Sequence, residues 1–222
     1  MQIARDHGLP NEFEKGHRPR HFAGALDRPD SVEVLLLLAE PGSNPGHWEI
    51  GRKIEDWLYE VCSDGLGKKG GHPFIYDPIH PYTPDCPDRF ARWPAEFFEK
   101  VFPDLSVEDR MGRVVIANSF WVQAKASGGR IGRRAERDFA PILGGFVRLF
   151  PSAIVVAAGG KARARLDLAG VRDRVEMRAL TLPEANKPEA RQSREAAAKT
   201  LRERLLANTG DGGKGTKCST GS

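Results

Sequence analysis

Four short runs of apolar residues occur along the chain, separated by longer segments. They lie at residues 32–39, 113–117, 153–158 and 175–182 and consist almost entirely of β-branched residues, leucine and alanine. Runs of this kind, bounded by turn residues, are typical of strands covered on both faces, as in a parallel sheet. The pattern therefore predicts four parallel strands.

Helical periodicity fills the intervals between these runs. Apolar residues recur at the spacing of one helix face in three segments, marked by Ile54, Trp57, Leu58 and Val61, by residues 139–150, and by Ala190, Ala197, Leu201 and Leu205. Residues 160–170 are expected to form a further short helix. Strands that alternate with helices in this way predict an α/β fold, a three-layer α/β/α sandwich with a four-stranded parallel sheet.

The length of the chain predicts one domain rather than two. A chain of 222 residues suits a single well-buried domain, which we assign to residues 1–207. Residues 63–95 are rich in Gly, Pro, His and Asp and are expected to form an ordered functional loop. Residues 208–222 have low complexity and are expected to form a flexible tail.

Composition argues against several classes of protein. No segment approaches the roughly 20 apolar residues of a membrane span, and the first residues lack the apolar core of a signal peptide, so we expect a cytoplasmic protein with no membrane partner. Three cysteines without a C-x-x-C pair disfavour a disulfide scaffold, a zinc ribbon and an iron–sulfur cluster. A metal site from Cys62, His72, His80 and Cys86 would be irregularly spaced, and we favour loop residues there.

The chain is mildly basic, with a net charge of +4 and a pI near 9.0. Positive residues concentrate in three predicted loops, at residues 15–21, 67–72 and 128–137. These loops suit contact with a phosphate backbone, although solvated loop charge gives the same pattern.

A turn rich in proline and glycine, residues 40–49, directly follows the first predicted strand. Asn44 suits a helix N-cap, Pro45 suits the first helical position, and the glycines allow close approach of the backbone to another molecule. A helix N-terminus at the carboxyl end of a buried parallel strand is where open α/β folds bind ligands. The turn is a candidate ligand site, and a capped helix without a ligand is the alternative.

The turn and two later segments resemble the uracil-DNA glycosylase superfamily. Gly42 to Gly46 matches the G-x-N-P-G turn of its mismatch-specific and single-strand-selective branches at every fixed position, and Ala39 to Gly42 is similar to the G-E-x-P-G form of other branches. "RVVIANSFWVQA" has Asn118 where the superfamily carries an asparagine that reads the flipped base, and "AIVVAAGGKARARL" is similar to its strand-three segment.

This resemblance implies removal of uracil or another deaminated base from DNA, by base flipping and N-glycosidic hydrolysis, without a metal or organic cofactor. DNA is the implied partner, and we expect a monomer. Asn44 would position the water, with Glu40 as the alternative, and Asn118 would bind the base edge. The other implied contacts with the substrate are Gly42, Ser43, Pro45 and Gly46 of the turn and an aromatic floor from Trp48, Phe74 or Tyr76.

The last motif of the superfamily is changed in this chain. A His-Pro-Ser turn is expected after strand four, but the sequence has Leu182, Pro183 and Glu184. The candidates for gripping phosphate or stabilising the leaving base there are Pro183, Asn186, Lys187 and Arg191.

The missing histidine keeps two other hypotheses open. Beside the glycosylase, these are a non-catalytic member of the fold that binds damaged or single-stranded DNA and an unrelated α/β enzyme that binds a phosphorylated small molecule at the turn. The turn lacks the G-x-G-x-x-G and P-loop patterns, which disfavours a nucleotide cofactor.

Overall fold

A computed structural model describes residues 5–9, 23–26, 28–39, 89–121, 131–180 and 186–211. Within these ranges one sheet contains β1 (Ala23–Gly24), β2 (Val34–Leu38), β3 (Val114–Asn118), β4 (Ile154–Ala158) and β5 (Val175–Met177). The strand order is β1-β3-β2-β4-β5, and β2 to β5 are parallel. The predicted four parallel strands are confirmed, and β1 adds a short antiparallel strand beside β3.

The fourth strand is shorter than the sequence predicts, because it ends at Met177 rather than at residue 182. Its neighbour β4 ends opposite Met177, and the backbone N–H of Arg178 donates to Oγ of Ser193 on the following helix instead of to a strand. The chain therefore leaves the sheet where it loses its partner.

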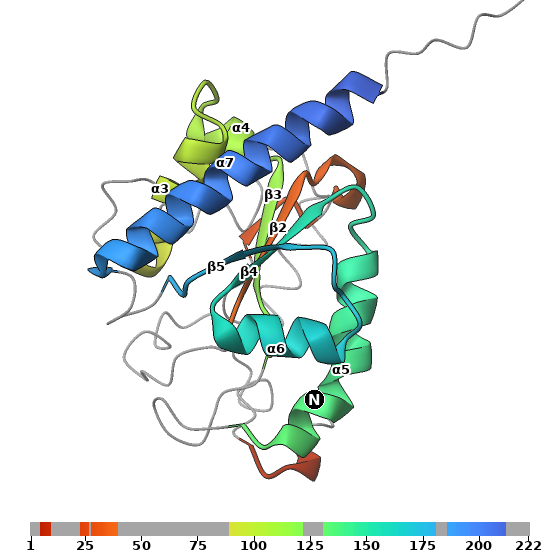
Figure 1. Ribbon diagram of the computed structural model, residues 1–222. Helices are drawn as coiled ribbons and strands as arrows, with labels where there is room; N and C mark the ends of the chain where they lie inside the picture. The colour runs from red at the N-terminus through yellow and green to blue at the C-terminus, as the bar shows by residue number, and fades with distance from the viewer. Residues whose placement is uncertain are drawn as a thin grey trace, which may run out of the picture.

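Helices cover both faces of the sheet (Figure 1). On one face lie α3 (Arg89–Val101), α4 (Val107–Met111) and α7 (Pro188–Asp211), and on the other lie α5 (Arg133–Arg148) and α6 (Gly160–Leu168). A single turn of 3₁₀ helix, η2 (Pro29–Ser31), precedes β2.

Alternation along the strands explains why both faces are buried. In β2, Val34 and Leu36 pack with α3 and α7, while Leu35 and Leu37 pack with α5 and α6, and all four are fully buried. A strand that is apolar on both sides needs cover on both sides. The structure therefore has the expected α/β character, with an apolar core on each face of the sheet.

Helix α3 corrects part of the predicted loop at residues 63–95, since residues 89–95 belong to this helix. Trp93, Phe97 and Val101 recur every four residues and are at most 4% exposed, so the segment is an amphipathic helix that packs on the sheet. Pro94 lies within this helix, although a proline in the sequence favours a helix break.

Other predicted segments lie outside the described residues or have different bounds in the structure. Residues 63–88 and the predicted helix at Ile54 to Val61 lie outside the described residues. Helix α7 continues to Asp211, within the segment assigned to the tail. In the described part of the chain, no helix combines the length and apolar character that crossing a membrane requires.

Candidate functional site

The strand order creates a switch point between β2 and β4. The chain passes from β2 to its neighbour β3 on one side, and later from β4 to its neighbour β5 on the other side. In open parallel sheets the connections diverge at such a point, and ligands bind there, outside the carboxyl ends of the strands. The carboxyl ends of β2, β3 and β4 therefore define the candidate site.

Asn118 is the last residue of β3, the position expected from the sequence, and it lies beside Leu38 of β2. The residue is 1% exposed. Its Nδ2 is the one buried side-chain polar atom without a hydrogen-bond partner among the described residues. Because burying an unpaired amide costs about 1–3 kcal/mol, such groups call for an explanation, and a bound ligand is one.

The backbone around Asn118 is firmly held. Nε1 of Trp121 donates to the carbonyl oxygen of Asn118 at 2.9 Å, and the N–H of Ser119 donates to the carbonyl oxygen of Leu38 at 2.7 Å. The Trp121 ring in turn packs edge-on against Phe139 of α5 at a centroid distance of 5.3 Å. The unpaired amide thus extends from a fixed backbone position.

A buried arginine lies on the other face of the same edge. Arg165 of α6 is 2% exposed, and its Nη1 donates to the carbonyl oxygen of Ala39 at 2.8 Å and to Oγ of Ser119 at 3.3 Å. Its Nε donates to Oε1 of Glu136 on α5 at 3.0 Å, and its guanidinium lies 5.2 Å from the ring centre of Phe120. One side chain thus joins the ends of β2 and β3 to both covering helices.

Sequence reasoning missed Arg165, Glu136 and Ser119. A signal for Arg165 was present, because Ala162, Arg165, Leu166 and Ala169 follow the spacing of one helix face. A charged residue on an otherwise apolar face indicates a buried charge that needs partners. The partners themselves come from three other segments of the chain.

The connection from β4 to α6 requires glycine. Gly159 has φ 95° and ψ 167°, a region that only glycine adopts readily. A Cβ at this position would also lie 2.9 Å from Cβ of Ala179, which follows β5. The close approach of these two connections shapes the edge of the sheet at the switch point.

Basic residues lie at the starts of two helices that begin at this edge. Arg133 and Arg134 begin α5, Lys187 precedes α7, and Arg191 lies in the first turn of α7; all four are exposed. Helices that follow parallel strands begin at the carboxyl edge, so these cations lie toward the edge of the sheet that holds Asn118 rather than toward the opposite edge.

One further arginine on α7 is almost buried. Burial lowers the pKa of Arg194, as does nearby Arg191, against the opposing effect of Glu96 and Glu195. Arg194 lies on the buried face of α7 with Ala190 and Ala197, and Glu96 of α3 is among the charges near it.

Many of the predicted site residues are not placed. Glu40, Gly42, Ser43, Asn44, Pro45, Gly46, Trp48, Phe74, Tyr76 and Pro183 lie outside the described residues, as do Cys62, His72, His80 and Cys86. Asn186 is described, and it is exposed two residues before α7 begins. Within the described ranges, no three His, Cys, Asp or Glu side chains gather as metal ligands would.

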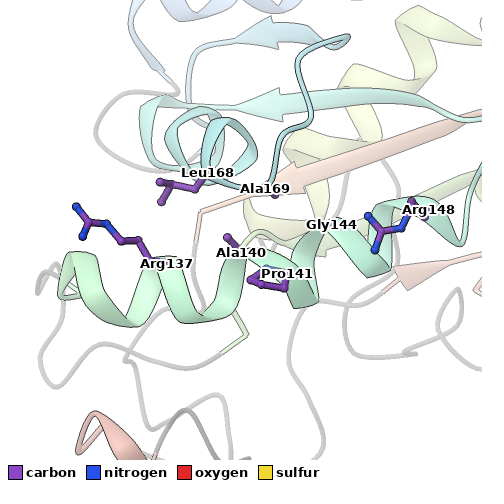
Figure 2. Close-up of a pocket in the computed structure, with 7 residues that line it drawn as sticks. All are labelled: Arg137, Ala140, Pro141, Gly144, Arg148, Leu168 and Ala169. Carbon is purple, nitrogen blue, oxygen red and sulfur yellow. The ribbon is translucent and has the colours of Figure 1, made fainter.

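A surface cleft of about 480 Å³ lies between α5 and the end of α6 (Figure 2). It is lined by Arg137, Ala140, Pro141, Gly144, Arg148, Leu168 and Ala169. Leu168 and Ala169 stand at the end of α6, whereas the switch point lies at its beginning. The cleft contains none of the candidate catalytic or base-binding residues predicted from the sequence, although Arg137 belongs to the basic segment at residues 128–137.

No family model matches the chain, and neither the curated proteins nor the solved structures include a significant match. Functional inference therefore depends on the residues of this chain and their arrangement.

Proposed function

We propose that this protein is a DNA repair glycosylase-like enzyme that removes uracil or another deaminated base from DNA. The observation that carries the proposal is the buried, unpaired Nδ2 of Asn118 at the carboxyl edge of the sheet. An asparagine amide offers one donor group and one acceptor side by side, which complements a base carbonyl and the adjacent ring N–H. This is the edge that a flipped uracil presents.

The reaction is a hydrolysis. The oxygen of a water molecule forms a bond to C1′ of the deoxyribose, the C1′–N bond breaks, and its electron pair leaves with the base. The water gives up one proton to solvent, which leaves a hydroxyl on C1′, and the departing base takes up one proton. Negative charge builds on the base carbonyls during this step, so the Nδ2 donor of Asn118 stabilises the transition state more than the bound substrate. Asn44 positions the water, with Glu40 as the alternative.

Charge around the edge supports a nucleic-acid partner. Arg133, Arg134, Lys187 and Arg191 lie at the starts of α5 and α7, toward the same edge of the sheet as Asn118. Exposed cations on several elements suit binding to successive phosphates, which positions a strand without reading its sequence. Asn186, at the same place, is available to the leaving base or to phosphate.

A non-catalytic DNA-binding protein is the second candidate. Leu182, Pro183 and Glu184 replace the histidine turn that stabilises the leaving base in the superfamily, and this change favours loss of cleavage with retention of binding.

Base release from end-labelled oligonucleotides separates these functions. Single- and double-stranded substrates carry one uracil, hypoxanthine or xanthine, and abasic products are revealed by alkaline scission. The variant is Asn118→Ala, and the matched control is Asn208→Ala, at an exposed position near the end of α7.

We expect release by the wild type and by Asn208→Ala, and a loss on the order of 10²-fold in Asn118→Ala, the size of effect seen when one such donor is removed. Absence of release with retained DNA binding would establish the non-catalytic candidate. Absence of both, with thermal stabilisation by a phosphorylated small molecule, would indicate the unrelated α/β enzyme.

A further inference from the structure

We infer that Arg165 is a positioning residue of this site, which fixes Ala39, just after β2, relative to Ser119 and hence to Asn118. The role of Arg165 in activity rests on the proposed function. Its role in positioning rests on the contacts of its own side chain.

The carbonyl oxygen of Ala39 is the hydrogen-bond acceptor that three donors share. It accepts from Nη1 of Arg165 at 2.8 Å, from Oγ of Ser119 at 2.9 Å and from the N–H of Phe120 at 3.2 Å. Ala39 immediately precedes Glu40 in the chain, and Ser119 immediately follows Asn118. The same hydrogen bonds therefore set where the chain leaves β2 and where it leaves β3.

The geometry requires a guanidinium. Arg165 directs one nitrogen at two oxygens on the strand ends and another nitrogen at the Glu136 carboxylate. The planar fork of arginine serves such divergent acceptors at once, whereas a lysine ammonium is a point charge on a flexible stem. Charge-assisted hydrogen bonds are also stronger than neutral ones.

Stability alone does not account for this arginine. A buried ion pair adds little net stability over an apolar replacement of similar size, because desolvation offsets the attraction. The strand ends are in addition joined by the 2.7 Å hydrogen bond from Ser119 to Leu38, which does not involve Arg165. What Arg165 supplies is the position of Ala39 against Ser119.

Arg174 provides a matched control. Its side chain is 7% exposed and pairs with Asp167 at 2.8 Å and with Glu176 at 2.8 Å. It lies between α6 and β5, where the chain enters the sheet, so it stands at the edge opposite to the site. Arg174 is thus another paired arginine with a largely covered side chain, and the inference gives it no part in positioning.

The experiment compares Arg165→Met with Arg174→Met by two readouts. The first is base release with kcat and KM measured separately, at temperatures where circular dichroism shows each variant folded. The second is the NMR signal of the Asn118 side-chain amide, assigned with Asn118→Ala. In Arg165→Met we expect kcat to fall at least tenfold with KM little changed, and the amide signal to shift.

In Arg174→Met we expect wild-type kcat and an unshifted Asn118 signal, even where the melting temperature falls. Wild-type kcat and an unshifted signal in Arg165→Met would overturn the inference, as would equal effects in the two variants. If Arg165→Met does not fold, Arg165→Lys takes its place with the same expected results, because lysine keeps the charge but not the fork.

Failure of the proposed function is distinguishable from failure of this inference. A wild type that releases no base refutes the glycosylase proposal. The amide signal still tests Arg165 in that case, since a shift in the Arg165 variants alone supports the positioning role and its absence refutes it.

Discussion

The carbonyl oxygen of Ala39 accepts a hydrogen bond from Nη1 of Arg165 at 2.8 Å, across 126 residues of sequence. This bond ties the end of the first parallel strand to the helix that follows the third, β4. Helix α6 is thus more than a cover for the sheet, because it also holds the edge at which ligands bind in folds of this kind.

Asn118→Leu should separate stability from activity. The substitution removes a buried amide whose Nδ2 has no partner, so we expect the unfolding free energy to stay constant or to rise by about 1–2 kcal/mol. Base release should be lost. Urea unfolding measures the first effect, with Asn208→Leu as the exposed control. A loss of stability above about 2 kcal/mol would show that the amide is already engaged in the unliganded protein.

Gly159→Ala should destabilise the protein more than Gly170→Ala. Both glycines have positive φ, at 95° and 76°, but a Cβ on Gly159 would meet Ala179 at 2.9 Å, whereas no atom lies within 4 Å of one on Gly170. We expect Gly170→Ala to lower the unfolding free energy by about 1–2 kcal/mol, because of the backbone conformation alone, and Gly159→Ala to lower it by more. Thermal unfolding of the two variants tests this order. Equal losses of stability would show that the contact with Ala179 adds no steric cost.

Leu201→Ala should cost about 2–5 kcal/mol of unfolding free energy. Leu201 on α7 is fully buried in the core that α3 and α7 form over the sheet. Leu206→Ala, on the same helix but 72% exposed, should change it by less than about 0.5 kcal/mol. Similar losses in both variants, measured by denaturant unfolding, would contradict this docking of α7.

Glu176 should make stability depend on pH in the acid range. Burial by itself would raise its pKa, but hydrogen bonds from Arg163 and Arg174, and their charges, bring the pKa below its ordinary value of 4.5. A lowered pKa in the folded state stabilises the protein above the ordinary value, and this contribution is lost as the pH falls through the folded pKa. The side chain is 41% exposed, so the effect should be modest.

NMR titration of Glu176 measures this directly. Arg163→Met should move the midpoint upward, and Glu176→Gln should weaken the fall of unfolding free energy between neutral and acid pH. A midpoint that does not move in Arg163→Met would show that this ion pair is not formed in solution.

The parallel strands could be predicted from the sequence because each is buried on both faces, which leaves a nearly continuous apolar run. Strand β1 could not, since two residues with a glycine carry no periodic signal. Helix α3 was missed because Pro94 interrupts a segment that tertiary packing of its aromatic residues holds together.

The candidate site was predictable only in part. A strand-end asparagine is visible in the sequence, so the position of Asn118 was anticipated. Its unpaired Nδ2 is a property of the fold, because it depends on which groups surround the amide. The contacts of Arg165 are also beyond sequence reasoning, since they reach residues separated from it by 29, 46 and 126 positions.

The first parallel strand, β2, stands between β3 and β4 in the finished sheet. During synthesis it emerges before either neighbour, and residues paired across β2 and β3 are separated by 80 positions. Until β3 follows, a strand of one valine and four leucines has both edges unpaired, which is the kind of segment that associates with other chains. The order of its strands thus leaves the apolar residues 34–38 without a partner strand until most of β3 has been made.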